Sequence, residues 1–323
     1  MFSKIKQKLR IQRSFYKIAL NDARRYLNYS MVFDAFKTQE RLLGLIIARQ
    51  HVVEKGLTMP ETRLGFGKDN IVEMLKLCEK YCEMFDVSHE QFRSAIAVLK
   101  EYIQYHVLQS YKLEEDFLNQ IQHLTNKFPG IQPSAQGKTT PELFFKDTEE
   151  SFLKFANSRH TVRNYSTEDV PIELVEKAID LAKTAPSACN RQPVRAHVCC
   201  GKVKEEVIKL HKGNRGFGDR ANKVIVITSN LSSYMNVMER NCCYLDGGIF
   251  VMNLLYALHY YRIGACTLNW STSIESDNEL RNILVLPEEE EIICLICIGK
   301  LPEKLSIAKS ERIDTERIIT IHE

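Results

Sequence analysis

One cluster of basic and polar residues in the second half of this 323-residue chain has side chains suited to binding an anion. The segment from Ser158 to Arg163 reads Ser-Arg-His-Thr-Val-Arg, so two arginines lie four residues apart with a histidine and a hydroxyl between them. Guanidinium groups make paired, charge-assisted hydrogen bonds to phosphates and stack on planar electron-rich groups. The segment is therefore a candidate phosphate or ring site, although such a cluster alone is more typical of a solvated or capping group.

Two further segments are compatible with the same chemistry. Residues 186–193 read Pro-Ser-Ala-Cys-Asn-Arg-Gln-Pro and offer polar amides on a backbone that two prolines stiffen. Residues 309–312 read Lys-Ser-Glu-Arg and supply another basic pair. The glycine spacing of a Rossmann fingerprint, a nucleophile elbow and a paired-carboxylate motif are all missing from the sequence. These absences argue against a Rossmann dehydrogenase and the common hydrolases.

In order and spacing, the segments resemble those of the FMN-dependent nitroreductase family. Its members carry an Arg-Arg-Ser-x-Arg-like segment, similar to Arg159-His160-Thr161-x-Arg163, and later a Pro-Ser-x-x-Asn-x-Gln-Pro-Trp-like turn, similar to residues 186–193. Residues 246–248, 264–267 and 298–300 fall where the central helix and the glycine-containing strands of that family belong. The resemblance covers roughly residues 150–323. Two departures are Val194, which stands where an aromatic residue is frequent, and residues 1–128, which have no counterpart in the minimal family.

The resemblance implies that FMN binds non-covalently at the interface of a homodimer. Arg163, Lys309 and Arg312 would lie near the phosphate or the pyrimidine edge, and residues of the 186–193 turn would contact the isoalloxazine ring, some of them from the partner subunit. No protein acid or base is assigned, because the flavin itself carries out the difficult step. The full set of implied cofactor-binding residues is Arg159, His160, Thr161, Arg163, Pro186, Ser187, Asn190, Gln192, Thr267, Leu268, Asn269, Lys309 and Arg312.

The function implied by the resemblance is an NAD(P)H-dependent FMN oxidoreductase. NADH or NADPH would deliver a hydride to FMN, leave, and be replaced by a small-molecule electron acceptor such as a nitroaromatic compound or a quinone. One alternative is a flavin-binding docking or regulatory module with little turnover. Another is a flavin enzyme dedicated to one metabolite, which the charged, glycine-containing segment His51–Gly67 would help to recognise as a lid. The structural interpretation of that segment is a helix end followed by an ordered turn.

Periodicity predicts an α+β fold in which a nitroreductase-like mixed sheet, flanked by helices, follows an all-helical domain. Residues 1–128 are predicted as a helical accessory domain, 129–147 as a Pro/Gly/Ser/Thr-rich linker and 148–323 as the FMN-binding domain. In the last region we expect helices near 148–157, 171–184, 202–211, 240–262 and 275–285, and strands near 194–200, 223–229, 264–268 and 291–298.

Several local expectations follow from sequence motifs. Thr38 is expected to cap a helix that stops at Gly56, and Ser88 with Gln91 forms a predicted capping box. Residues 317–322, Arg-Ile-Ile-Thr-Ile-His, are predicted as a strand that needs a partner, for which a neighbouring subunit is one candidate. The paired glycines at 247–248 inside an apolar helix suggest close approach by another backbone, either the sheet or a second subunit.

The N-terminus is strongly basic. Residues 1–25 contain eight Lys and Arg against Asp22, interleaved with Ile5, Leu9, Ile11, Phe15 and Ile18. A helix of this kind either makes weak contact with an anionic membrane surface or packs its apolar side on its own domain. The whole-chain net charge of +3 gives no reason to expect a nucleic-acid partner. Ten cysteines without paired metal-binding spacing are typical of free thiols in a reducing compartment, so a cytoplasmic protein without a metal site is expected.

Overall fold

The computed structural model describes residues 2–29, 36, 38–234 and 237–323 of the chain. These residues form two compact units, one made of Met1–Gly137 together with Ala308–Glu323 and the other of Lys138–Ile307. The sequence-predicted boundaries were 128 and 148, and the sequence pattern assigned the C-terminal tail to the second domain. In the structure, residues 308–323 belong to the helical unit.

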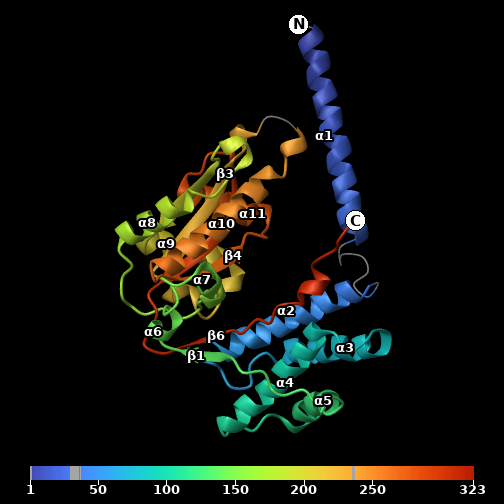
Figure 1. The fold of residues 1–323 in the computed structure, drawn as a ribbon. Helices are drawn as coiled ribbons and strands as arrows, with labels where there is room; N and C mark the ends of the chain where they lie inside the picture. Colours follow the sequence, from blue (N-terminus) through green and yellow to red (C-terminus); the bar gives the residue numbers. More distant parts are fainter. Residues whose placement is uncertain (1, 30–35, 37, 235–236) are drawn as a thin grey trace. The chain divides into compact units, whose positions relative to one another are not determined.

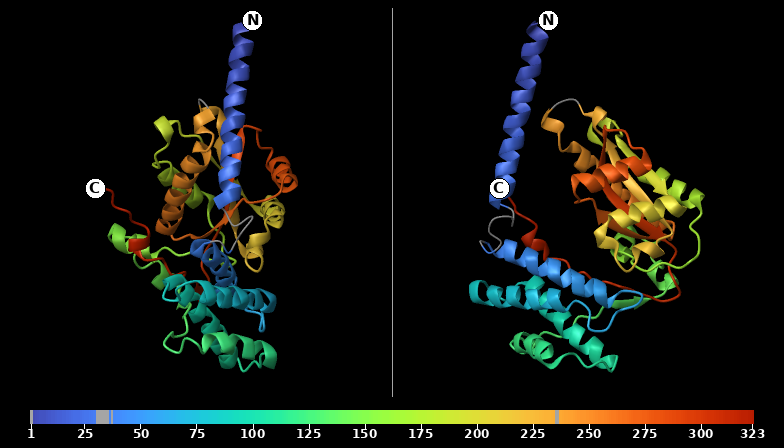
Figure 2. Two further views of the ribbon diagram at one scale, coloured as in Figure 1. Left: turned by 90° about the vertical axis from the view of Figure 1, so that its right-hand side faces the viewer. Right: turned by 180° about the vertical axis from the view of Figure 1, so that it is seen from behind.

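The regular secondary structure of the first unit is helical, apart from Gly137 at the start of a short strand. It contains α1 (Phe2–Tyr29), α2 (Gln39–Leu57), α3 (Lys68–Met84), α4 (Glu90–Leu108) and α5 (Glu115–Thr125). Helix α2 packs on α3 and α4, and α5 packs on the same two helices (Figures 1 and 2). Large side chains such as Tyr81, Phe92 and Tyr102 are fully buried between them. Because these helices are amphipathic, their apolar sides form one shared core.

The predicted caps have different outcomes. Thr38 caps α2 as expected, since its hydroxyl accepts a hydrogen bond from the Arg41 backbone N–H. The capping box at Ser88 is wrong. The N-cap of α4 is His89, whose Nδ1 accepts from the Gln91 N–H, while the Ser88 hydroxyl donates to the Asp86 carboxylate. Asp86 therefore competes successfully for the hydroxyl that the capping box would need.

The His51–Gly67 segment forms the end of α2 and an ordered turn into α3. Gly56 lies inside α2, and a Cβ there would stand 2.0 Å from the Phe66 ring, so only glycine admits that ring. Gly65 has φ of +69° and donates its N–H to His106 Nε2, and the Tyr102 hydroxyl donates to the Phe66 carbonyl. These contacts explain why glycine occupies positions 56 and 65, and they agree with the interpretation of the segment as a helix end followed by an ordered turn.

The second unit combines helices with two sheets. Its helices are α6 (Pro141–Phe144), α7 (Phe152–Ser158), α8 (Ile172–Ala182), α9 (Gly201–Leu210), α10 (Cys242–Tyr260) and α11 (Ile274–Leu284). Its main sheet contains β2 (Val194–Cys199), β3 (Lys223–Asn230), β4 (Gly264–Asn269) and β5 (Glu290–Gly299), and a small sheet pairs β1 (Gly137–Thr139) with β6 (Leu305–Ile307). The α+β class is confirmed, and the predicted helices and strands of this region match these elements closely.

The main sheet has the order β2-β3-β5-β4 with antiparallel pairing throughout its described strands. Helices α8 and α10 pack together on one face, while α9 and α11 pack together on the other (Figure 1). Both faces of the central strands are thereby covered. Almost every residue of β3 and β5 is buried, which explains why their sequences are nearly continuous apolar runs.

Helix α10 is the longest element of the second unit and is apolar enough to cross a membrane by length and composition alone. It packs on the sheet, and a Cβ at Gly247 would lie 2.8 Å from the Ile293 side chain. Gly247 therefore allows α10 to pack closely on the sheet, which is one of the two expected reasons for this glycine. The group that approaches it is a side chain of the sheet and not its backbone. At Gly248 a Cβ would meet nothing within 4 Å, so this glycine faces open space.

The predicted strand at 317–322 is wrong. Residues Thr315–Arg317 form a short 3-10 helix, and the residues after it have no regular structure. Arg317 Nε forms an ion pair with Glu90 Oε2 at 2.9 Å, which anchors the tail to α4. Ile318, Ile319 and Ile321 are exposed. A short apolar run forms a strand only where a neighbouring edge accepts its hydrogen bonds, and no such edge adjoins this tail among the described residues.

Candidate functional site

The arginine-containing segment at 158–163 is held in place by the ends of β4 and β5. The Val162 N–H donates to the Ala265 carbonyl, and the Val162 side chain is buried. The Tyr165 hydroxyl donates to the carbonyls of Val162 and Cys297 at 2.9 and 3.1 Å. A Cβ on Gly299 would lie 2.7 Å from the Tyr165 ring, which explains why this strand ends in glycine. The backbone that carries the predicted phosphate-binding residues is therefore fixed.

Positive charge gathers at the same place. Arg159, His160, Thr161 and Arg163 are all half-buried. His259, near the end of α10, lies behind them with its Nε2 2.8 Å from Ser158 Oγ. Burial, with the nearby charges of Arg159 and His160, lowers the pKa of His259 to about 4. Burial is the largest cause and disfavours any charge, whereas the contribution of the adjacent cations is of the kind that would attract an anionic group such as a phosphate.

The 186–193 turn has an unusual backbone. Cys189, Asn190 and Gln192 have φ values of 52°, 54° and 49°, which is the left-handed region that non-glycine residues seldom adopt. The Ser187 hydroxyl accepts a hydrogen bond from the Gln192 N–H at 3.0 Å and so closes the turn. Left-handed backbone persists only where the surroundings impose it, and such strain is concentrated at functional sites.

The surroundings that impose this backbone come from α10 and its preceding loop. Asp246 is 3% exposed and accepts hydrogen bonds from the Ala188 N–H and the Tyr234 hydroxyl, both at 3.1 Å. Arg191 makes a two-fold ion pair with Glu239, with N–O distances of 2.9 and 3.0 Å. The Arg191 guanidinium also lies over the Tyr234 ring. These contacts fix the turn from two sides.

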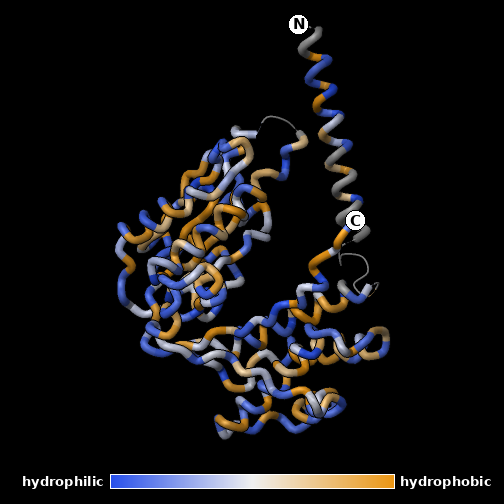
Figure 3. Tube along the Cα trace, viewed as in Figure 1, coloured by the Kyte–Doolittle hydropathy of each residue, from blue (hydrophilic) through white to orange (hydrophobic). Residues whose placement is uncertain are grey.

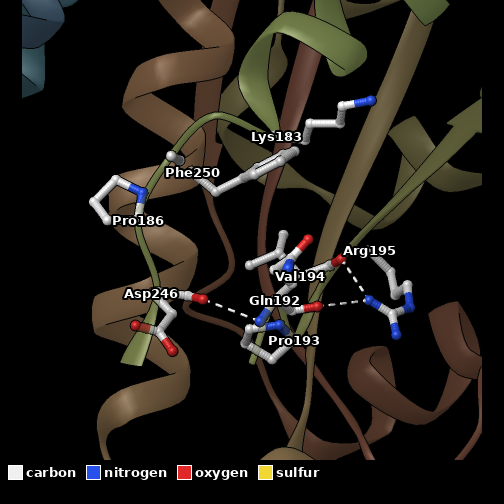
Figure 4. A pocket seen from close by; sticks show the side chains of 10 residues that line it. Lys183, Pro186, Gln192, Pro193, Val194, Arg195, Asp246 and Phe250 are labelled. Carbon is white, nitrogen blue, oxygen red and sulfur yellow. Dashed lines mark hydrogen bonds between the residues drawn. The ribbon is translucent and has the colours of Figure 1, made fainter. Parts of the chain in front are cut away.

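A cavity of about 160 Å³ adjoins this turn (Figure 4). Its wall includes Gln192 and Arg195, which are joined by a hydrogen bond from Arg195 Nη1 to the Gln192 carbonyl at 3.0 Å. The other lining residues are Lys183, Ala185, Pro186, Ser187, Pro193, Val194, Asp246 and Phe250. The cavity thus combines apolar side chains with two cationic side chains, one carboxylate, a hydroxyl and an amide. Such a lining suits part of a flat, polar-edged ring.

The structure does not bring the turn and the arginine segment together within one chain. The Ala188 N–H is hydrogen-bonded to Asp246, and Ser158 is hydrogen-bonded to His259. His259 lies thirteen residues after Asp246 in α10. At 1.5 Å per residue, these anchors are about 20 Å apart along α10. The sheet leads to the same conclusion. The turn adjoins the start of β2 at one edge of the sheet, and Val162 adjoins the start of β4 at the other edge. Because β2 and β4 start at opposite ends of the two central strands, β3 and β5, the two segments are also separated along the strand direction. No side chain reaches across that distance.

The remaining predicted residues lie elsewhere. Thr267 and Asn269 are exposed on β4, while the Leu268 side chain is buried, so Leu268 could meet a ligand only through its backbone. Lys309 and Arg312 belong to the helical unit. There the Lys309 N–H donates to Gln136 Oε1 and its Nζ pairs with Glu311 at 2.6 Å. Their part in cofactor binding stays a prediction.

Several residues of these two sites escaped prediction from the sequence. His259 and Asp246 sit in an apolar helix, and Glu239 and Tyr234 lie in the irregular segment before it. A buried carboxylate within an apolar helix is a usable signal, because burying a charge is costly unless it has partners. The partners themselves are distant in sequence and could not be paired without the fold.

Among the described residues no group of three or more His, Cys, Asp or Glu side chains is arranged to hold a metal ion. All ten cysteines are free thiols, with Cys189 and Cys200 exposed. Cys294 and Cys297 are buried in β5, and burial raises the pKa of both thiols. The CxxC spacing in that strand thus belongs to the core.

Comparison with known proteins finds relatives of the second unit. Residues 156–300 match the model of the nitroreductase family. An iodotyrosine deiodinase from Haliscomenobacter hydrossis is 24% identical over 224 residues, which cover 60% of this chain and 98% of that protein. A nitroreductase family protein from Streptococcus pneumoniae superposes with a TM-score of 0.47 at 22% identity, over 53% of this chain and 100% of the other. An FMN-dependent nitroreductase from Clostridium difficile superposes with a TM-score of 0.42 at 18% identity, over 52% of this chain and 96% of the other. Residues 156–300, a little under half of the chain, thus carry the match to the nitroreductase family.

Proposed function

We propose that this protein is an FMN-dependent oxidoreductase of the cytoplasm that takes electrons from NADH or NADPH and reduces a small organic acceptor. The observation that carries the proposal is the presence of two family motifs, each held in a fixed conformation. The half-buried Arg159–Arg163 segment presents cations, and the 186–193 turn presents amides beside a cavity. When bound, FMN would accept a hydride from the nicotinamide and pass electrons to a nitro compound or a quinone.

The residues present fit this cofactor. Arg159 and His160 would hold the phosphate, because their side chains offer several N–H donors and Arg159 adds a positive charge. Asn190 and Gln192 would hydrogen-bond the polar edge of the ring. A cation near that edge favours the electron-rich reduced form of a flavin, and Arg163 is our candidate for this role. The apolar walls beside Phe250 would keep water from the ring.

We further propose that the complete site forms between two copies of the chain. The two motifs lie about 20 Å apart in one copy, so a cofactor that uses both needs a second copy. One side of α10 supports this proposal, because Leu245, Ile249 and Met252 are 61%, 36% and 37% exposed there, beside the open space at Gly248. These residues follow the i, i+4, i+7 spacing of a packing face, and Phe152 and Leu153 add to the exposed apolar surface.

The decisive experiment is a visible absorption spectrum of freshly purified protein, repeated after anaerobic addition of NADH or NADPH. We expect a flavin band that bleaches with the reductant and returns when a nitroaromatic compound or a quinone is added. A colourless protein that cannot be reconstituted with FMN would overturn the assignment. A flavin band that persists with both nicotinamides would favour a docking or regulatory module with little turnover.

Two variants test where the cofactor binds. Arg163→Ala should weaken FMN binding by about tenfold or more, because one charge-assisted contact is lost. Met252→Glu should convert the dimer to a monomer and lower FMN affinity with it, since a charge would be buried in the interface. Sedimentation velocity and fluorescence titration with FMN measure the two effects. A monomer that retains full FMN affinity would refute the shared site.

A second candidate is a flavin enzyme dedicated to one aromatic metabolite. It is favoured by the match to iodotyrosine deiodinase, which extends over nearly the whole of that protein. The two candidates differ in acceptor range. Steady-state rates with a nitroaromatic compound, a quinone and a halogenated tyrosine should differ modestly for a broad reductase. A rate that is at least a hundredfold higher for one aromatic substrate would identify a dedicated enzyme.

A further inference from the structure

The N-terminal helix α1 presents its side chains to solvent. Every side chain from Ile5 to Lys17 is exposed, and the apolar ones are included. Leu9 is 50% exposed, Tyr16 is 64% and Leu20 is 70%. The hypothesis that this helix packs its apolar side on its own domain therefore finds no support in these residues. Exposed aliphatic side chains at this density call for another explanation.

The exposed apolar residues form a stripe along the helix. With 100° between successive residues, Ile5, Leu9, Tyr16 and Leu20 fall within about 60° of one another around the helix axis. A helix of 28 residues is about 42 Å long, and the stripe follows more than half of it. Figure 3 shows the hydrophobic positions recurring along α1 between hydrophilic ones. Ile11 and Phe15 form a second, shorter apolar patch on another side.

Basic residues lie directly beside the stripe. Five of them occupy the adjoining sector, about 80–140° from Ile5, and extend over the same length as the apolar side chains, while Lys8 lies on the other side of the stripe, about 60° from Ile5. No acidic residue occurs before Asp22, so the positive charge of the helix is not balanced locally. The members of this basic sector are Lys6, Arg10, Arg13, Lys17 and Arg24, and the side chains of Lys4, Ile18, Asp22 and Arg25 lie outside the described part of the chain.

The apolar stripe and the adjoining basic sector together favour one kind of partner. A second copy of α1 would bring two like-charged sectors together, which opposes self-association. Nucleic acid would neutralise the basic sector and leave the apolar stripe in water. An anionic lipid surface satisfies both, because the stripe enters the acyl boundary while the adjoining lysines and arginines meet the headgroups.

We propose that α1 is an interfacial helix that docks the protein on an anionic membrane surface. The helix lies in the plane of the interface with Ile5, Leu9, Tyr16 and Leu20 inserted and the basic sector against acidic headgroups. Binding is reversible, since a few inserted side chains and a few charges provide modest affinity. This inference is independent of the flavin site and of its substrate.

The test is co-sedimentation of the full-length protein with vesicles. Vesicles of phosphatidylcholine alone are compared with vesicles that contain about one third phosphatidylserine, at physiological ionic strength. We expect binding only to the acidic vesicles, with loss of binding in high salt. Equal binding to both kinds of vesicle, or binding to neither, would overturn the proposal.

Two α1 variants separate the contributions of charge and apolar surface. Removing three charges of the basic sector should weaken binding about a hundredfold, and replacing three apolar residues of the stripe should weaken it at least tenfold. Because these side chains are exposed, neither change should alter the melting temperature. The charge variant is Lys6→Gln, Arg10→Gln and Arg13→Gln, and the apolar variant is Ile5→Gln, Leu9→Gln and Leu20→Gln.

A matched control keeps the net charge of the charge variant while leaving α1 intact. It replaces three exposed lysines in other helices and in the loop before α5, and it should bind acidic vesicles as wild type does. If the control loses as much affinity as the charge variant, binding follows net charge alone and α1 is not the docking element. If wild-type protein instead binds RNA or duplex DNA in an α1-dependent way and ignores vesicles, the lipid assignment is wrong. The control is Lys76→Gln, Lys112→Gln and Lys202→Gln.

Discussion

Replacement of His259 tests whether burial, together with the adjacent cations, holds this imidazole neutral. The imidazole is 2% exposed, it lies 2.8 Å from Ser158 Oγ, and aromatic rings of Phe144, Phe145 and Phe155 surround it. Burial and the nearby positive charges lower its pKa to about 4. The folded protein therefore holds His259 neutral at neutral pH, and acidification must either protonate a buried, repelled group or unfold the chain.

The sign and size of the effect follow from linkage. The ordinary histidine pKa of 6.5 applies to the unfolded chain, so the unfolded state binds more protons between about pH 6.5 and pH 4. The stability associated with neutral His259 is fully present above this window and is lost as the pH falls through it. Between about pH 7.5 and pH 5 the loss is about 2 kcal/mol, and it approaches about 3 kcal/mol near pH 4.

The assay is urea unfolding at several pH values, followed by fluorescence of Trp270. This residue is the only tryptophan of the chain and lies in the same unit as His259, so its signal reports that unit. His259→Gln retains a hydrogen-bonding group beside Ser158 but cannot titrate, and it should remove about 2 kcal/mol of the pH dependence. His123→Gln, which changes an exposed residue of α5, is the matched control. If His259→Gln and wild type lose the same stability on acidification, the explanation is refuted.

Three other outcomes can be measured directly. Gly56→Ala should lower the free energy of unfolding of the helical unit by about 1–3 kcal/mol, because the added methyl would overlap the Phe66 ring, and urea unfolding followed by circular dichroism checks this. Asp246→Ala removes the acceptor of two hydrogen bonds at the 186–193 turn, so FMN affinity should fall by about tenfold in a fluorescence titration; unchanged affinity would mean that the turn holds its shape without this carboxylate. Ellman's reagent should modify the exposed Cys189 and Cys200 within minutes and the six buried cysteines only after unfolding, and fast reaction of more than four thiols would contradict this burial, since Cys82 and Cys242 are half-buried.

Local sequence patterns determined the elements of the second unit well. The helices and strands from α8 to β5 were predictable because each carries a clear periodicity and ends at turn-forming residues. The motifs at 158–163 and 186–193 were also recognisable, because their residue types and order are visible without the fold. Predictions failed where a competing contact was decisive. At Ser88 the competitor was Asp86, and at residues 317–322 a short apolar run has no strand edge to join among the described residues.

Tertiary structure alone decided which residues meet. Asp246 and His259 both belong to α10, yet Asp246 holds the 186–193 turn and His259 contacts Ser158. A sequence motif carries no distance, so only the packed helix shows that these two segments lie about 20 Å apart within one chain. Gly299 is a similar case, because the requirement for glycine is visible only in the fold, where the Tyr165 ring packs against this position. Local propensity specifies elements, whereas burial and the pairing of distant polar groups specify the site.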